Sequence, residues 1–283
     1  MKKFLSVLLA AVLVLSATVA LADGILIAVP NDATNEGRAL LLLQSYGIIT
    51  LKEGAGITAT EADIADDGNP LGIDLKEVEA AMVPNIIADV DYAIINNNYA
   101  LDAGLNPVED SLLIESADSP YVNVLCVKEG NEETPEAKAL AAALTSQQVV
   151  DFINNTYGGS AVATVAEPTD GYDPDVDYAA LAGTTITVCG TPVPHVEVLN
   201  IAKDILAAKD ITLDVITVTD YVTPNEMVEA GDIFANYFAH QPYQDDFNAQ
   251  NGTHIVTIAG IHVEPMALYG GKQTDLAALG IAE

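Results

Sequence analysis

The chain has 283 residues, and its 41 Asp and Glu against only 10 Lys and Arg give a formal net charge of -31 at pH 7. A field this negative repels nucleic acids and anionic lipid surfaces, which argues against proteins that bind either of them. The length suits one large domain or two lobes.

Residues 1–22 have the pattern of a secretory signal peptide. Lys2 and Lys3 precede an apolar run, and the small-x-small sequence Ala20-Leu21-Ala22 forms a cleavage site before Asp23. An uncleaved anchor helix is the alternative, but polar residues dilute the end of the apolar run. No cysteine lies near the cleavage point, so we expect an exported protein, periplasmic or extracellular, with no lipid attached.

Predicted strands and helices alternate along the remaining chain, which indicates an α/β fold. The expected strands are Ile25–Val29, Tyr92–Ile95, Tyr121–Val127, Thr184–Val188, Leu213–Val218, Ile233–Asn236 and Ile255–Val263. The expected helices are one starting near Thr34 or Asn35, a short one over Leu75–Ala81, a long one over Thr134–Tyr157, Pro194–Ala208 and one within Tyr221–Glu229. Asn96–Tyr99 is predicted as a turn because asparagines are poor strand formers and good turn and ligand residues.

The first strand leads through a turn into a helix that carries Arg38 in its first turn. Free backbone N–H groups at a helix N-terminus form an anion site, and a guanidinium can grip a carboxylate with two parallel hydrogen bonds. Arg38 therefore either holds the carboxylate of a small ligand or pairs on the surface with Glu36 or another nearby acid. These two alternatives are equally open at this point.

Residues 166–183 differ from the rest of the chain. They are acidic and broken by proline and glycine, which is typical of an extended linker. We expect this linker to pack weakly and to contact no ligand.

The remaining candidate residues point to no catalytic or metal chemistry. Cys126 and Cys189 lie in apolar strand-like runs and are expected as buried free thiols. His195, His254 and His262 lack metal-ligand spacing, so neither a metal site nor a cofactor is expected. The chain contains no nucleophile elbow, zinc-protease motif or phosphate loop, and we expect no enzyme.

Two blocks of sequence resemble a known family. One is Val29–Arg38 with the leucines after it, and the other is Asp220–Glu226 followed by Gly231–Ile233 and Phe238–Tyr243. Both are similar to the methionine-binding proteins of ABC importers, the NlpA/MetQ-type lipoproteins. Further similar segments are Ile95–Ala100, Ser119–Asn123, Thr191–His195 and His262–Met266.

The order of the two similar units is swapped relative to that family, so the chain resembles a circular permutant. The resemblance implies a two-lobed, type II periplasmic-binding-protein-like fold, each lobe a mixed sheet flanked by helices, with the ligand in the cleft. Lobe 2 is expected at 23–118 plus 269–283, and lobe 1 at 119–165 plus 184–268, with the acidic linker 166–183 joining the family's usual termini. Permutation is tolerated where termini are exposed and close together.

The resemblance also implies which residues bind the ligand. Arg38 is expected on the carboxylate, with Asn96 and Asn123 as hydrogen-bond partners of the amino and carboxylate groups. Asn35, in the same turn as Arg38, is included among the ligand residues. Aromatic rings suit a thioether side chain, and the expected side-chain pocket is Tyr221, Phe238, His240 and Tyr243, the last three beside a predicted loop at Gln241-Pro242.

The function implied is that of a monomeric binding protein that captures methionine or a close analogue and delivers it to an ABC importer permease. A secreted amino-acid sensing or scavenging module without a transporter is the alternative.

Overall fold

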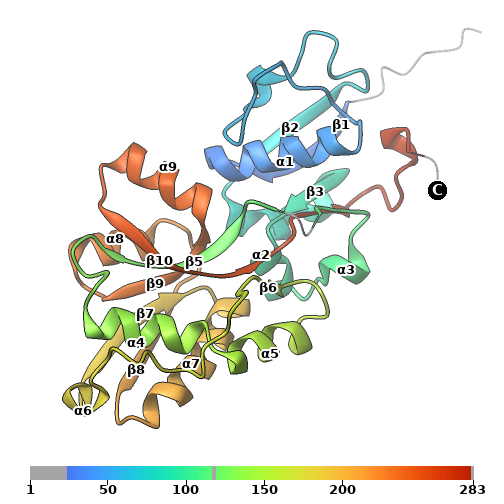
Figure 1. Ribbon diagram of the computed structural model, residues 1–283. Coiled ribbons are helices and arrows are strands. Elements are labelled where there is room, and N and C mark those ends of the chain that lie inside the picture. Colours follow the sequence, from blue (N-terminus) through green and yellow to red (C-terminus); the bar gives the residue numbers. More distant parts are fainter. Residues whose placement is uncertain (1–23, 117–118, 282–283) are drawn as a thin grey trace, which may run out of the picture.

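The computed structural model describes residues 24–116 and 119–281, and the predicted signal peptide lies outside them. Two sheets, each flanked by helices, form the two lobes (Figure 1). The sheet of lobe 2 has the strand order β2-β1-β3-β11-β4, and that of lobe 1 has the order β6-β10-β5-β9-β7-β8. Within the described residues, no helix is both long and apolar enough to cross a membrane.

Lobe 2 is built on a buried parallel core. Its strands are β1 (Ile25–Pro30), β2 (Ile73–Val78), β3 (Tyr92–Ile95), β4 (Leu113–Ile114) and β11 (Ala267–Gly270). β1 pairs in parallel with β2 and β3, and β11 runs antiparallel between β3 and β4. Its helices are α1 (Ala33–Ser45), α2 (Asn97–Asp102), α3 (Pro107–Asp110) and the 3-10 helices Glu61–Asp63, Ala80–Asp89 and Ala277–Leu279.

Alternate side chains of the lobe 2 strands pack on opposite faces, as the two-residue period of a strand requires. On one face Ile27 and Ile94 contact Leu40 and Leu43 of α1. On the other face the neighbouring strand residues pack against Val83 and against the start of α2. Both faces are therefore covered, which is why β1 and β3 are continuous apolar runs.

Lobe 1 has a mixed sheet between two helical layers. Its strands are β5 (Val122–Lys128), β6 (Val162–Ala163), β7 (Thr185–Gly190), β8 (Thr212–Thr217), β9 (Ala235–His240) and β10 (Ile255–Val263). Its helices are α4 (Pro135–Leu144), α5 (Gln147–Thr156), α6 (Tyr178–Leu181), α7 (Glu197–Ala207), α8 (Thr223–Ala230) and α9 (Gln241–Asn251). The largest apolar core lies between the sheet and α4, α5 and α7, while α8 and α9 cover the other face (Figure 1).

Cys126 and Cys189 belong to the smaller core beneath α8, and both are free and buried, which confirms the prediction. Burial raises the pKa of each thiol to about 12. Since the thiolate is the reactive form, both side chains act as small core residues.

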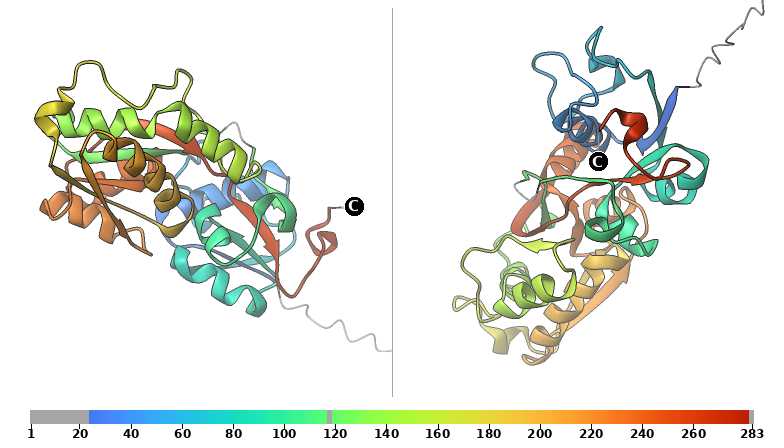
Figure 2. Two further views of the ribbon diagram at one scale, coloured as in Figure 1. Left: turned by 90° about the horizontal axis from the view of Figure 1, so that it is seen from below. Right: turned by 90° about the vertical axis from the view of Figure 1, so that its right-hand side faces the viewer.

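The chain crosses between the lobes twice. The first crossing joins β4 to β5 and includes Glu115 and Tyr121, and the second, Glu264–Met266, joins β10 to β11. Ala267 and Leu268 pair with β3 and β4, so their expected assignment to lobe 1 is wrong and the boundary lies at Met266. Figure 2 shows the C-terminal segment (red) returning to lobe 2 (blue and teal).

The acidic linker packs on lobe 1, and the expectation of weak packing is wrong. Thr169 exchanges backbone hydrogen bonds with Thr145 and Gln147 at 3.0 and 2.9 Å. Val176 and Leu181 belong to the large core of lobe 1, and Tyr172 lies under the ammonium of Lys209 at 4.3 Å. The count of acids and prolines concealed these apolar anchors, which are spaced between exposed aspartates.

Four local predictions are also wrong. The short helix predicted over Leu75–Ala81 is wrong, because residues up to Val78 pair along β1 as part of β2 and a 3-10 helix begins only at Ala80. The predicted long helix divides after Leu144, since the hydroxyl of Ser146 caps a new helix, α5. Asn97 begins α2 instead of a turn, and Gln241-Pro242 begins α9 instead of a loop, because proline is tolerated in the first helical turn.

Candidate ligand-binding site

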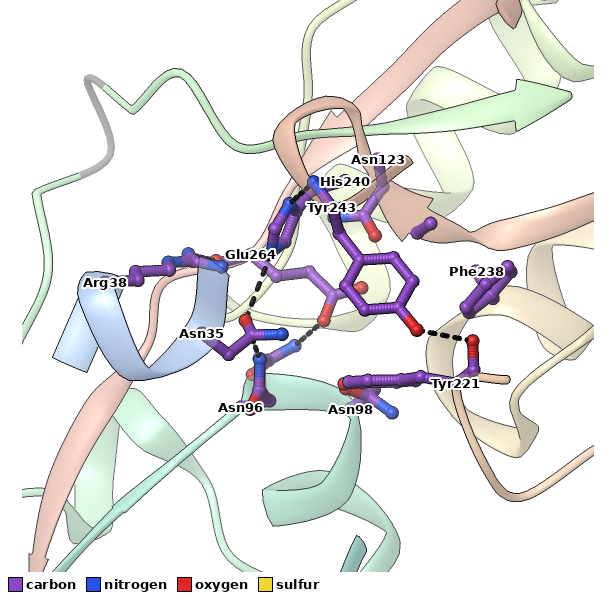
Figure 3. Close-up of a pocket in the computed structure, with 12 residues that line it drawn as sticks. Asn35, Arg38, Asn96, Asn98, Asn123, Tyr221, Phe238, His240, Tyr243 and Glu264 are labelled. Carbon is purple, nitrogen blue, oxygen red and sulfur yellow. Dashed lines mark hydrogen bonds between the residues drawn. The ribbon is translucent and has the colours of Figure 1, made fainter. Parts of the chain in front are cut away.

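A small cavity lies between the two lobes. Both lobes and the second crossing contribute side chains to it (Figure 3). The structure brings together here the predicted residues Asn35, Arg38, Asn96, Asn123, Tyr221, Phe238, His240 and Tyr243. It adds residues that the sequence analysis did not select, namely Asn97, Asn98, Ala239 and Glu264.

Three strand-to-helix turns position most of these side chains. β1, β3 and β9 each end at the cavity, and α1, α2 and α9 begin there. The carboxyl ends of adjacent parallel strands meet at one edge of a sheet, which is where α/β proteins bind ligands. Asp32 caps α1, accepting from the backbone N–H of Asn35 at 3.0 Å, so the expected cap at Thr34 or Asn35 is wrong.

Arg38 is buried, with 3% of its surface exposed, and joins both crossings. Its Nε and Nη2 donate to the carboxylate of Glu115, and Nη2 also donates to the backbone carbonyl of Glu264 at 2.6 Å. The guanidinium lies 4.2 Å from the ring centre of Tyr121. Glu36, the expected surface partner, instead accepts from the backbone N–H of Glu61.

These bonds use three of the five N–H groups of Arg38 and leave both hydrogens of Nη1 uncommitted among the described contacts. Arg38 thus pairs with an internal acid and also lines the cavity. The two sequence alternatives, a ligand partner and an ion-pair partner, are compatible in this geometry.

Asn35 fixes the orientation of two neighbours. Its amide nitrogen donates to the carboxylate of Asp32 at 2.8 Å, so its oxygen faces the site. That oxygen accepts from Asn96 Nδ2 at 2.7 Å and lies 3.1 Å from His240 Nε2. Asn96 therefore has its Nδ2 committed and its Oδ1 buried without a partner.

His240 uses both ring nitrogens. Its Nδ1 accepts from the backbone N–H of Tyr243 and caps α9, so Nε2 carries the hydrogen that is donated to Asn35. Burial and the nearby charge of Arg38 hold the pKa of His240 well below its ordinary value. The ring is therefore neutral, and only its apolar surface remains for a ligand.

The next two asparagines are also half-satisfied. Asn97 Nδ2 donates to Glu264 Oε2 at 3.2 Å, and Asn98 Oδ1 accepts from the hydroxyl of Tyr221 at 2.6 Å. Asn97 Oδ1 and Asn98 Nδ2 then remain buried without partners. Buried polar groups are nearly always paired in proteins, so unpaired groups that line a cavity indicate a polar ligand.

A buried network lies behind Asn123. His195 Nε2 lies 3.1 Å from Asn123 Oδ1, and its Nδ1 lies 2.7 Å from the hydroxyl of Thr191. Burial lowers the pKa of His195 to about 3, so the ring is neutral and donates from Nε2. Asn123 Oδ1 is thereby occupied, and its amide NH₂ is the group left for a ligand.

His195, His262 and Glu264 also meet in this network, with potential ligating atoms within 4.8 Å of one another. His195 lies far from His262 and Glu264 in the sequence, so an argument based on the spacing of the histidines did not find this cluster. The 2.6 Å between His262 Nε2 and Glu264 Oε1 is a hydrogen-bond distance, shorter than the roughly 3.3 Å between two ligands of one tetrahedral zinc ion. The geometry is that of a hydrogen-bonded triad.

Aromatic rings form the remaining wall. Tyr221 lies 5.9 Å from Phe238 and 5.7 Å from Tyr243, ring centre to ring centre. The Tyr243 hydroxyl donates to the backbone carbonyl of Tyr221 at 2.7 Å, which ties these two residues of the wall together (Figure 3). This wall suits an apolar or thioether side chain.

Comparison with known proteins identifies the family of this chain. The family model described as NlpA lipoprotein matches residues 15–165 and 186–281. The chain belongs to the NlpA lipoprotein family.

Relatives within the NlpA lipoprotein family match over about half of the chain. D-methionine-binding lipoprotein MetQ of Salmonella typhimurium is 41% identical over 144 residues, covering 50% of this chain and 52% of its own length. Lipoprotein 28 of Escherichia coli is 43% identical over 142 residues, covering 50% of this chain and 52% of its own length. The chain thus spans about half the length of the curated relatives it matches.

A nutrient binding protein from Burkholderia cenocepacia, solved bound to methionine, is 46% identical. The match covers 50% of this chain and 59% of that chain, with a TM-score of 0.48.

Glu264 and Asn97 are the main site residues that sequence reasoning missed. Both lie in segments that resemble the NlpA family, His262–Met266 and Ile95–Ala100. The signal for Glu264 was its position beside Pro265 at the end of the predicted strand Ile255–Val263, since polar residues at strand ends are candidates for ligand binding. The sequence did not show that the crossing after β10 would bring the Glu264 carboxylate to the cavity.

The role of Arg38 in joining the crossings predicts a stability effect without ligand. We expect Arg38→Ala to lower the free energy of unfolding by roughly 2–4 kcal/mol, because Glu115 would lose its partner in a largely buried site. Urea unfolding of the ligand-free protein measures this change.

Lys138→Ala is the matched control. Lys138 pairs with Glu133 at 2.9 Å, but these side chains are 36% and 83% exposed, so little or no change is expected. Equal urea midpoints for Arg38→Ala and the unchanged protein would contradict the structural role of this ion pair.

Proposed function

We propose that the protein binds methionine, or a close amino-acid analogue, between its two lobes. The observation that carries this proposal is the cavity lining, which combines uncommitted polar groups with an aromatic wall. An amino acid presents the complementary set, a charged carboxylate and ammonium beside one side chain. The printed names of the relatives, a D-methionine-binding lipoprotein and a methionine-bound nutrient binding protein, support methionine as the ligand.

The ligand carboxylate belongs beside Arg38. Nη1 of Arg38 offers two uncommitted N–H groups, and the amide of Asn123 offers further donors. Charge-assisted hydrogen bonds of this kind are the strong ones, particularly in a site shielded from water. Arg38, Asn123, Asn96 and Asn35 are thus proposed to hold or orient the polar end of the ligand.

The side chain of the ligand belongs against Tyr221, Phe238, His240 and Tyr243. Each of these rings lies about 6 Å from at least one of the others, centre to centre, and His240 is neutral. Contacts between sulfur and aromatic rings contribute roughly 0.3–1.5 kcal/mol each. Thioether recognition therefore follows from the aromatic wall that lobe 1 presents to the cavity.

The role that fits this site is that of an exported solute-binding protein that delivers its ligand to an ABC importer permease. We also propose, as expected from the sequence, that the protein is a monomer and catalyses no reaction. A sensing or scavenging module without a transporter uses the same cavity and differs only in its partner.

The first prediction concerns the ligand. Methionine should bind and raise the melting temperature, because a ligand at 100 times its dissociation constant adds about 2.7 kcal/mol of stability. Calorimetry and thermal shift with both isomers of methionine, norleucine and alanine test this, with alanine expected to be weakest since it leaves the aromatic wall empty. Absence of heat and of any thermal shift with the whole panel would sink the proposal.

We also propose that the chain is a circular permutant of the family, with the linker 166–183 joining the usual termini. The two segments matched by the family model stop and resume around this linker. Ile25 and Leu279, near the two described ends, contact the same core of lobe 2, so joining these ends is feasible.

This second proposal predicts that the usual order can be restored. A Gly/Ser loop between the present ends and a cut between Pro174 and Asp175, both exposed, should leave methionine affinity unchanged within a few fold. Each linker half keeps its anchors, Tyr172 on one side and Leu181 on the other. A control opened inside β7, between Val188 and Cys189, should fail to fold; an unfolded protein from the linker cut would overturn the permutation proposal.

A further inference from the structure

Glu264 presents a buried carboxylate to the cavity. Its surface is 5% exposed, and among the described residues its carboxylate forms no ion pair with a lysine or an arginine. Arg38 contacts only the backbone carbonyl of Glu264 and directs its charge to Glu115. The negative charge of Glu264 therefore lacks a partner of fixed positive charge.

The groups that do contact this carboxylate are hydrogen-bond donors. Tyr237, fully buried, lies with its hydroxyl 2.5 Å from His262 Nδ1, and burial raises the pKa of this tyrosine well above its ordinary value. The hydroxyl keeps its proton and donates to Nδ1, so His262 donates from Nε2 to Glu264 Oε1. His195, neutral as described, lies 3.4 Å from the same oxygen.

These donors keep Glu264 ionised. Burial raises the pKa of its carboxyl, but the two histidines and the hydrogen bonds from His262 and Asn97 outweigh burial and hold the pKa below its ordinary value. An ionised carboxylate that is held by hydrogen-bond donors and lines a largely buried cavity attracts a cationic group of a ligand, since charges are costly to bury unpaired.

Two further acceptors line the same cavity. Asn96 Oδ1 and Asn97 Oδ1 are buried without partners, while the amide nitrogens of both residues are held by Asn35 and Glu264. Asn35 Oδ1 accepts from Asn96, and Glu264 Oε2 accepts from Asn97. These two bonds fix the orientation of each amide and leave its oxygen free. A primary ammonium has three N–H donors and no acceptor, and it matches three acceptors.

We propose that Glu264, with the side-chain oxygens of Asn96 and Asn97, binds the α-ammonium of the amino-acid ligand. This assignment rests on the proposed function, and it adds the residue that distinguishes an amino acid from the corresponding carboxylic acid. Arg38 and Glu264 then occupy the two ends of a zwitterion, one reading the carboxylate and the other the ammonium.

The test compares methionine with its des-amino analogue, 4-methylthiobutanoate, by calorimetry. The unchanged protein should bind methionine at least about 30-fold more tightly, because the analogue leaves the Glu264 charge buried and unpaired. Glu264→Gln should weaken methionine binding by at least about 30-fold while leaving the affinity for 4-methylthiobutanoate unchanged or increased, so that the preference for methionine collapses.

Glu197→Gln is the matched control. Glu197 accepts from the Tyr157 hydroxyl at 2.6 Å in the same lobe but does not line the cavity, so the same change of charge should leave the methionine preference intact. A purely structural role for Glu264 would weaken both ligands alike and would overturn the assignment. Equal binding of the two ligands by the unchanged protein would overturn it as well, even if Glu264→Gln does not fold.

The identity of the ligand and the role of Glu264 are tested separately. If the unchanged protein binds another amino acid but not methionine, the methionine proposal fails, while a loss of that amino acid in Glu264→Gln still supports the ammonium site. If methionine binds with full preference in Glu264→Gln, only the role of Glu264 is wrong.

Discussion

The bonds of Arg38 connect lobe 2 to both crossings between the lobes. This side chain extends from α1 of lobe 2 to the carboxylate of Glu115 on the first crossing and to the carbonyl of Glu264 on the second. The crossings also bond to each other, since the Glu115 N–H donates to the carbonyl of Met266 at 2.9 Å. One guanidinium therefore sets the position of both connections, and with them the relation of the lobes.

Each of these polar side chains uses one end for hydrogen bonds within the protein and presents its other end to the cavity. Asp32, Glu115 and the buried histidines satisfy one end of Asn35, Arg38 and Asn123, which fixes the direction of the other end. Preorganised groups lose little entropy when a ligand arrives, which favours affinity. The strongly negative surface would repel an anionic ligand, but a zwitterion carries no net charge, so this field does not oppose its entry.

Sequence reasoning found the local chemistry of the site more readily than its long-range contacts. The apolar run before Pro30 and the asparagines after Ile95 identified two strand ends, and the aromatic residues around His240 identified the wall. Each of these signals lies within a few residues. The pairing of Arg38 with Glu115 spans 77 residues, and no local pattern carries that information.

The wrong predictions have a common physical origin in tertiary packing. β2 looked helical because its polar residues suit a helix, yet pairing along β1 decides its conformation. The linker looked unstructured by composition, yet Tyr172, Val176 and Leu181 anchor it on lobe 1. Local preference is a weak guide wherever a few apolar contacts with distant residues decide the outcome.

The central claim is that the cavity between the lobes holds an amino acid with a fixed polarity. A crystal structure of the protein grown with L-methionine tests this most directly. The account predicts the ligand carboxylate against Nη1 of Arg38, the ammonium against Glu264 and the sulfur among Tyr221, Phe238 and Tyr243. Methionine bound outside this cavity, or bound with its ammonium toward Arg38, would contradict it.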